Sequence, residues 1–170
     1  MFCDVPEEAV ISTPDARSIY EVPLNLERQG VADYIIDKMK LGPMTTRRNM
    51  DSWERFVSRV VNPKREVTIA LVGKYTYLSH LEAFTHAGAA RECKVRIRFI
   101  DSDDLLKEDP GKLLGGVHGV IVPGGFGIRG VEGKIVAARY ARENMVPFLG
   151  VCLGFQIATI EFCRHVLGLE

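Results

Sequence analysis

The sequence predicts an α/β protein with a doubly wound, mostly parallel sheet, and two observations lead to this prediction. From residue 66 onward, short apolar segments alternate with longer segments whose apolar residues recur at helical spacing. Two of the short segments end in glycine-rich turns that run directly into a helical pattern. This alternation is typical of parallel strands joined by helices that cover both faces of a sheet.

Four strands and three helices are expected in this part of the chain. The strands are expected within residues 66–75, 94–101, 116–125 and 146–151. The helices are expected within residues 77–89, 131–144 and 153–170. The first strand, "EVTIALVGKY", is nearly continuously apolar in its middle, as a strand buried on both faces should be.

Residues 1–65 have a different character. One helix is expected from about Leu26 to Lys40, and an amphipathic helix is expected around Ser52–Val61. The apolar stripe of the second helix consists of Trp53, Phe56, Val57 and Val60. No separate core is visible in this part, so it is expected to be the end of another domain followed by a connector. The predicted boundaries are residues 1–43 for that domain tail, 44–65 for the linker and 66–170 for the α/β domain.

The composition excludes several classes of protein. The 170 residues are 46% hydrophobic and 26% charged, which is ordinary for a globular protein with a core. The formal net charge is zero, so no field attracts nucleic acid or an anionic membrane. No apolar run approaches the roughly 20 residues that span a bilayer, and no secretion signal is visible at the N-terminus. The four cysteines form no CxxC pair, so no zinc site or disulfide framework is indicated, and a cytoplasmic location is expected.

The first glycine-rich turn is "VPGGFGIRGVEGK", residues 122–134. It contains a formal GxGxxG match at 125–130, but no acidic residue follows the next strand to hold a ribose, so dinucleotide binding is not favoured. A P-loop is also excluded, because Ile135 follows Lys134 where serine or threonine is needed. Side-chain-free backbone amides after a strand can instead stabilise an oxyanion. A simple tight turn is the other interpretation of this segment.

The second turn is "GVCLG", residues 150–154. A cysteine between two glycines, after a strand and before a helix, has the form of a nucleophile elbow with cysteine in place of serine. The helix N-terminus favours the thiolate, and the Leu153 N–H is a candidate oxyanion donor. Unpaired cysteines are more often buried fillers, but the two glycines and the neighbouring turn favour a nucleophile at Cys152. The other cysteines lack such surroundings and are expected to be structural: Cys3, Cys93 and Cys163.

These motifs resemble a known family. "PGGFG…RG.EGK" followed by "PFLGVCLGFQ" resembles the class I glutamine amidotransferases, and "SIYEVPLNLERQGVADYI" and "EVTIALVGKY" are similar to segments of the CTP synthase family among them. The resemblance implies a class I amidotransferase fold preceded by the end of a synthetase domain. It also implies a homotetrameric enzyme that makes CTP from UTP, ATP and glutamine-derived ammonia. GTP is its activator, CTP its inhibitor, and Mg²⁺ accompanies the nucleotides, with no covalently bound cofactor.

The resemblance also implies roles for individual residues. Cys152 corresponds to the thiol that attacks the glutamine carboxamide and becomes a glutamyl thioester. The glutamine pocket and oxyanion hole correspond to Gly125, Leu153, Gly154, Phe155 and Gln156, where the family commonly has Met at the position of Phe155. A lid linked to GTP activation corresponds to Arg129, Gly130 and Glu132. Contacts to the ATP base correspond to Phe2, Asp15 and Ala16, and no metal ligand is assigned.

The sequence departs from the family pattern in its histidines. The family places a His-x-Glu pair well downstream of the cysteine, and no such pair lies between Cys152 and Glu170. His80-Leu-Glu82 has the right spacing but lies upstream in an expected helix, where residues two apart point about 200° away from each other. All four histidines are therefore expected to be structural or exposed. A short family segment after "VGKY" is also absent, through a deletion or an unrecorded loop.

The chain is accordingly expected to be a fragment of such an enzyme, with little or no glutaminase turnover by itself. Two alternatives remain open. One is a non-catalytic regulatory or interaction piece built on the same sheet, which the missing His-Glu pair favours. The other is a different triad glutaminase or an esterase-like hydrolase, which residues 1–65 make less attractive because those relatives do not need them.

Overall fold

The structure is a computed structural model that describes residues 4–42, 49–74 and 78–169. The chain divides into two compact units, Met1–Pro63 and Lys64–Glu170, and each is described here by itself. The second unit contains the sheet and both glycine-rich turns.

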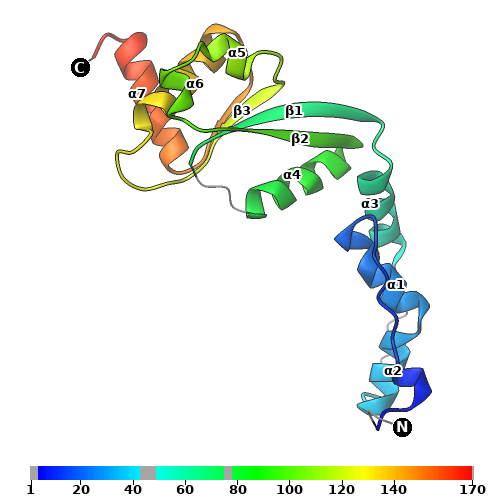
Figure 1. Cartoon of the computed structure of the whole chain (residues 1–170). Helices are drawn as coiled ribbons and strands as arrows, with labels where there is room; N and C mark the ends of the chain where they lie inside the picture. Colours follow the sequence, from blue (N-terminus) through cyan, green and yellow to red (C-terminus); the bar gives the residue numbers. More distant parts are fainter. Residues whose placement is uncertain (1–3, 43–48, 75–77, 170) are drawn as a thin grey trace. The chain divides into compact units, whose positions relative to one another are not determined.

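The sheet has four parallel strands, as the alternating pattern predicts. They are β1 (Arg65–Val72), β2 (Cys93–Ile100), β3 (Gly119–Val122) and β4 (Phe148–Gly150), in the order β2-β1-β3-β4. The chain first builds outward from β1 to β2, then returns to the other side of β1 for β3 and β4 (Figure 1). In such sheets, binding sites lie at the carboxyl ends of the strands near the point where the direction of winding reverses.

Helices cover both faces of this sheet, and the alternation of side chains along the strands shows how. Ala70 and Val72 of β1 form a buried cluster with Ala137 and Ala141 of α6 (Val131–Glu143). The intervening Ile69 points to the opposite face, where it lines a groove with Phe84 of α4 (Leu78–Ala90). Helix α7 (Leu153–His165) packs against α6, β3 and β4. The doubly wound arrangement predicted from the sequence is thus present.

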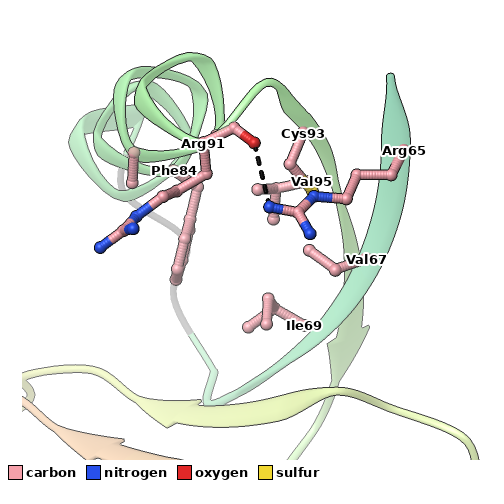
Figure 2. Close-up of a pocket in the computed structure, with 9 residues that line it drawn as sticks. Arg65, Val67, Ile69, Phe84, Arg91, Cys93 and Val95 are labelled. Carbon is pink, nitrogen blue, oxygen red and sulfur yellow. Dashed lines mark hydrogen bonds between the residues drawn. The ribbon is translucent and has the colours of Figure 1, made fainter. Parts of the chain in front are cut away.

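An apolar groove of about 280 Å³ runs between α4 and the β1–β2 ribbon. Figure 2 shows the ring of Phe84 reaching from α4 toward Val67 and Ile69. At one end of the groove the Arg65 guanidinium donates a hydrogen bond to the Arg91 carbonyl at 3.3 Å. A second hollow of about 170 Å³ continues from Phe84 and Ile69 toward β3 and β4.

The connection from β2 to β3 contains two short elements that the sequence pattern does not predict. They are the 3₁₀ helix η3 (Asp104–Leu106) and α5 (Pro110–Leu114). Asp109 caps α5 by accepting a hydrogen bond from the Gly111 amide at 3.1 Å, and Pro110 occupies the first helical position. Five residues are too few for a helical period to stand out. Leu105 and Leu114 are nevertheless buried in the main core.

The first unit corrects one prediction, because the single helix expected from Leu26 to Lys40 is two helices. They are α1 (Val22–Arg28) and α2 (Val31–Lys38), separated at Gly30, whose φ is +73°. Glycine adopts this left-handed conformation at little cost, and the chain changes direction there. The unit also contains the 3₁₀ helices η1 (Glu7–Ala9) and η2 (Ile19–Glu21), and α3 (Asp51–Val61).

The apolar stripe predicted on α3 holds this first unit together. Trp53 donates a hydrogen bond from its indole N–H to the Tyr20 carbonyl at 2.9 Å. The rings of Tyr20 and Phe56 meet edge to face with centroids 5.0 Å apart. Val57 is buried, as is Leu24 of α1. This is a small core, and the sequence analysis had expected none.

Across the described residues, no helix is long and apolar enough to cross a membrane.

Candidate active site

The two glycine-rich turns lie side by side because the strands before them are neighbours. Val122, the last residue of β3, pairs with Gly150, the last residue of β4. The Val151 amide then donates a hydrogen bond to the Val122 carbonyl at 3.0 Å. Both turns therefore leave the same carboxyl edge of the sheet, where binding sites of doubly wound folds are found.

Cys152 occupies a strained position at the second turn. Its φ of 53° and ψ of −106° lie outside the regions that residues with a side chain normally adopt. It is the N-cap of α7, and its carbonyl accepts hydrogen bonds from the Phe155 amide at 3.1 Å and the Gln156 amide at 3.3 Å. Its side chain is exposed. A cysteine held in this way presents its sulfur to solvent at a helix N-terminus, which is the geometry of a nucleophile elbow.

The flanking glycines are required by close backbone contacts. A Cβ on Gly150 would lie 2.4 Å from the carbonyl of Gly154. A Cβ on Gly154 would lie 2.0 Å from the carbonyl oxygen of Val122. Both distances are far below van der Waals contact, so only glycine lets α7 approach the strands this closely. The sharp turn around Cys152 depends on that approach.

The first turn lies directly against the cysteine. A Cβ on Gly124 would be 3.6 Å from the Cys152 Cβ, and a Cβ on Gly125 would be 3.4 Å from Leu153 Cδ2. Leu153 is the first residue of α7, where helical amides have no acceptor within the helix. The structure therefore brings the Gly124–Gly125 segment, which has no side chains, close to Cys152 and Leu153. Such an arrangement can stabilise negative charge next to a nucleophile.

The other residues predicted for the glutamine pocket lie in the first turn of α7. Gly154 is buried in the contact with β3, whereas Phe155 is 68% exposed and Gln156 is also exposed. The side chains of Phe155 and Gln156 are therefore accessible to solvent in this turn.

A cluster of cations lies behind the first turn. Lys134 of α6 is 5% exposed, and its Nζ is 3.5 Å from the position that a Cβ on Gly125 would take. Burial lowers the pKa of the Lys134 ammonium, and the charge of Lys74 lowers it further. Together with Arg129 they line a cavity of about 120 Å³ beneath the glycines. Lys74 forms an ion pair with Asp103, and that hydrogen bond holds the pKa of the Asp103 carboxyl below its usual value.

The three residues predicted for the lid differ in their exposure and in the residues they contact. Arg129 is exposed and borders the cavity. Gly130 forms the N-cap of α6 with a φ of +76°, a conformation that glycine adopts at little cost. Glu132 turns toward α7, where its carboxylate accepts a hydrogen bond from Arg164 at 3.1 Å. The contact of Glu132 joins the first turn of α6 to the last turn of α7, at the end of α7 opposite the elbow.

The histidines lie elsewhere. His80 and His86 are on α4, and His118 accepts a hydrogen bond at Nδ1 from the Thr68 amide at 3.1 Å. His165 ends α7, about 20 Å along the helix from Cys152. Among the described residues, no histidine is hydrogen-bonded to Cys152. Cys93 is buried and Cys163 is partly buried, unlike Cys152.

Two of the residues predicted at the ATP base belong to the first unit. Asp15 and Ala16 lie in the first unit, between η1 and η2, with Asp15 exposed and Ala16 half-buried. Phe2 lies outside the described residues, as do Cys3 and the segment after Lys74 where a family insertion is absent.

Lys134, which lies close to the first turn, was not predicted from the sequence as a residue of interest. The spacing of Lys134 from Ala137, Ala138 and Ala141 puts all four residues on one face of the helix, and the three alanines are buried. A lysine on the apolar stripe of a helix is an exception that needs a local reason. The burial of Ser102 was not predicted either. Ser102 is fully buried, and a Cβ on Gly133 would lie 1.7 Å from its carbonyl oxygen.

Comparisons with known proteins agree with this arrangement of elements. Residues 74–170 match the family described as glutamine amidotransferase class-I, and residues 1–41 match CTP synthase N-terminus. The CTP synthase of Methanocaldococcus jannaschii is 51% identical over 181 residues, covering 100% of this chain and 33% of that protein. The CTP synthase of Carboxydothermus hydrogenoformans is 53% identical over 175 residues, covering 100% of this chain and 32% of that protein. The chain thus spans about a third of the length of these relatives.

A solved structure is similar as well. It is described as the Trypanosoma brucei CTPS glutaminase domain with bound acivicin. It superposes with a TM-score of 0.54 and is 46% identical in sequence, over 60% of this chain and 42% of that one. The α/β architecture is therefore shared with that glutaminase domain.

Proposed function

Because the chain belongs to the CTP synthase family and carries part of a class I glutamine amidotransferase domain, we propose that Cys152 is the nucleophile of a glutamine-hydrolysing site. The ammonia released there serves the ATP-dependent amination of UTP to CTP in the complete enzyme. The observation that carries the proposal is the exposed Cys152 at a strained elbow, with the Gly124–Gly125 segment close to Cys152 and Leu153.

In this proposal, the Cys152 thiolate attacks the carboxamide carbon of glutamine and a C–S bond forms. The carbonyl π electrons move onto oxygen, and the Gly125 and Leu153 N–H groups donate hydrogen bonds to that oxyanion. When the tetrahedral intermediate collapses, the C–N bond breaks and ammonia leaves after its nitrogen has taken a proton. Water then attacks the glutamyl thioester, glutamate is released and the thiol is restored.

The proton transfers are assigned to the His-Glu pair that the family carries further along the chain than residue 170. No described histidine is hydrogen-bonded to Cys152, so the chain by itself is expected to form the thioester slowly and to turn over little glutamine. Phe155 and Gln156 are proposed to border the substrate, because their side chains are exposed at the same edge of the sheet as Cys152.

The rest of the enzyme's chemistry is proposed from the family alone. Arg129, Gly130 and Glu132 are assigned to a lid that responds to GTP, and Asp15 and Ala16 to contacts with the ATP base. Among the described residues, no three His, Cys, Asp or Glu side chains gather into a group that could hold a metal ion. The complete enzyme is proposed to be a homotetramer inhibited by CTP. A cytoplasmic location is proposed, because a free thiol stays reduced there.

The experiment that tests the proposal is covalent labelling. The chain is incubated with the glutamine analogue diazo-oxo-norleucine, and in parallel with acivicin, which the trypanosomal structure contains. Peptide mass spectrometry should place one adduct on Cys152, and excess glutamine should slow its formation. The matched variant Cys152→Ser should remain unlabelled. Labelling at Cys93 or Cys163 instead, or no protection by glutamine, would contradict the proposal.

A second candidate, a non-catalytic interaction piece, is favoured by the absence of a histidine bonded to Cys152 among the described residues. The two candidates differ in one measurement. A chain that only interacts with partners should react with iodoacetamide at its exposed thiols but should show no preference for the glutamine analogue.

A further inference from the structure

We propose that Lys134 is a positioning residue of this site: its buried ammonium lies behind the Gly124–Gly125 segment and stabilises the negative charge that forms in front of it. This inference rests on the proposed function, since it assigns a role in the same glutamine-hydrolysing site. Nothing in the comparisons assigns a role to this side chain.

The glycine segment lies close to both the lysine and the cysteine. A Cβ on Gly124 would be 3.6 Å from the Cys152 Cβ. A Cβ on the adjacent Gly125 would be 3.5 Å from Lys134 Nζ. The ammonium is therefore close enough to the elbow to act on a charge there through Coulomb's law, although the exposure of Cys152 to solvent weakens the effect.

The lysine has no counter-ion in the described part of the chain. Lys134 is 5% exposed and lines the cavity behind the glycines, and none of the ion pairs found among the described residues involves it. The charged groups that face its cavity are Lys74 and Arg129, both cationic, and Asp103 forms an ion pair with Lys74. The cavity thus carries an excess of positive charge directly behind the glycines.

An uncompensated buried charge is costly, and that cost argues for a role at this position. The lowered pKa of Lys134 has burial as its main cause and agrees with this picture. The free-energy cost of burying the Lys134 ammonium falls when a negative charge forms nearby. The ammonium therefore stabilises each anion of the proposed reaction relative to the neutral form of the same group. Those species are the Cys152 thiolate and the oxyanion at the Gly125 amide. The ammonium also packs against Gly125 and thereby holds the loop in place.

The test follows the pH dependence of thiol alkylation. Iodoacetamide reacts with the thiolate, and peptide mass spectrometry reports modification of Cys152 separately from the other cysteines. The variant Lys134→Met removes the charge and keeps the length of the side chain, and Lys134→Gln keeps polarity. Arg139→Met on the same helix is the matched control, because Arg139 is paired with the exposed Glu143.

Removal of the ammonium should shift the alkylation profile of Cys152 to higher pH by about half a unit to one unit, because one opposite charge that is not in direct contact lowers the pKa of an exposed group by less than a contacting charge does. At pH 7 this corresponds to a threefold to tenfold slower reaction. Arg139→Met should leave the profile unchanged. Unchanged profiles in both Lys134 variants, with native circular dichroism spectra, would overturn the inference.

A reciprocal measurement on the unsubstituted chain covers the case in which the variants do not fold. The NMR titration of ¹³C-labelled Lys134 is recorded before and after Cys152 is capped with iodoacetamide, which removes the thiolate. If the two charges are coupled, the titration midpoint of Lys134 falls on capping. A midpoint that does not move would contradict the inference. Neither measurement depends on glutamine, so failure of the analogue to label Cys152 would count against the proposed function alone.

Discussion

Arg142 of α6 and Glu161 of α7 form a bidentate ion pair in which the carboxylate is almost completely buried. The guanidinium donates from Nη2 to Oε1 at 2.8 Å and from Nε to Oε2 at 3.0 Å. The Glu161 side chain is 3% exposed, whereas the Arg142 side chain is 35% exposed. The hydrogen bond to Glu161 is also the main reason why the pKa of Arg142 is raised. This pair joins the helix after the first glycine-rich turn to the helix after the second.

The first prediction concerns this pair. Arg142→Met leaves the buried Glu161 carboxylate without its main counter-ion, which is far more costly than the loss of an exposed pair. The variant should lower the thermal unfolding midpoint by several degrees, measured by circular dichroism at pH 7. The control is Arg139→Met, which breaks the 2.8 Å pair with the exposed Glu143 and should change the midpoint by about a degree or less. Equal effects in the two variants would show that Glu161 is not held by Arg142.

The second prediction sets helix propensity against packing at Gly154. Helix propensity alone predicts that replacing a helical glycine by alanine stabilises the protein by about 1 kcal/mol. The close approach of Gly154 to the Val122 carbonyl predicts destabilisation instead, because the new Cβ would lie 2.0 Å from that oxygen. Gly154→Ala is therefore expected to destabilise the chain by about 1–3 kcal/mol, as overpacking does, in urea unfolding.

Gly124→Ala is the matched control for that change. Its new Cβ would be 3.6 Å from the Cys152 Cβ, which is ordinary contact, and its φ is not in the left-handed region. Its stability should change by less than about 1 kcal/mol. If Gly154→Ala stabilises the chain instead, α7 does not approach β3 as closely as described.

The third prediction concerns the strain at Cys152. Glycine tolerates a φ of 53° with a ψ of −106°, and alanine does not. Both Cys152→Gly and Cys152→Ala should abolish labelling by the glutamine analogue. The glycine variant should be more stable than the alanine variant by about 1 kcal/mol or more in urea unfolding, because strained conformations of this kind cost about 1–3 kcal/mol. Equal stability of the two variants would mean that the elbow is not strained.

The fold was largely predictable because its signals are local. The apolar runs of β1 to β4 and the helical spacing in α4, α6 and α7 each lie within a dozen residues, and their alternation specifies the parallel sheet. The break at Gly30 was not predicted, since apolar spacing continues through it and only the backbone conformation reveals it. The helix α5 was missed because one turn of helix has no measurable period.

The site was predictable only in part, for a physical reason. Cys152 and its flanking glycines are adjacent in the sequence, so a strand–turn–helix motif identifies them as candidates. The contacts of Lys134 with Gly125 and of Glu132 with Arg164 join segments from different elements. Their geometry depends on how α6 packs, which spacing along the chain does not encode. The sequence signal of that packing was the helical spacing of Lys134 with Ala137, Ala138 and Ala141.

The last prediction concerns the stability cost of Lys134 and its dependence on pH. Burial, and then the charge of Lys74, lower the pKa of Lys134 below its ordinary value of 10.5. The unfolded chain therefore binds a proton more tightly at this group than the folded chain does, and the charged lysine destabilises the fold at neutral pH. That penalty is fully present below the folded pKa, decreases as pH rises through it, and is gone above the unfolded value.

Lys134→Met should consequently be more stable than the unsubstituted chain at pH 7, and its advantage should shrink as pH approaches 10.5. The measurement is urea unfolding of both chains from pH 7 to 10.5, with Arg139→Met as the control whose difference should not vary with pH in this way. An advantage that stays constant or grows with pH would mean that the ammonium is compensated in the folded state, and the excess of positive charge behind Gly125 would not exist.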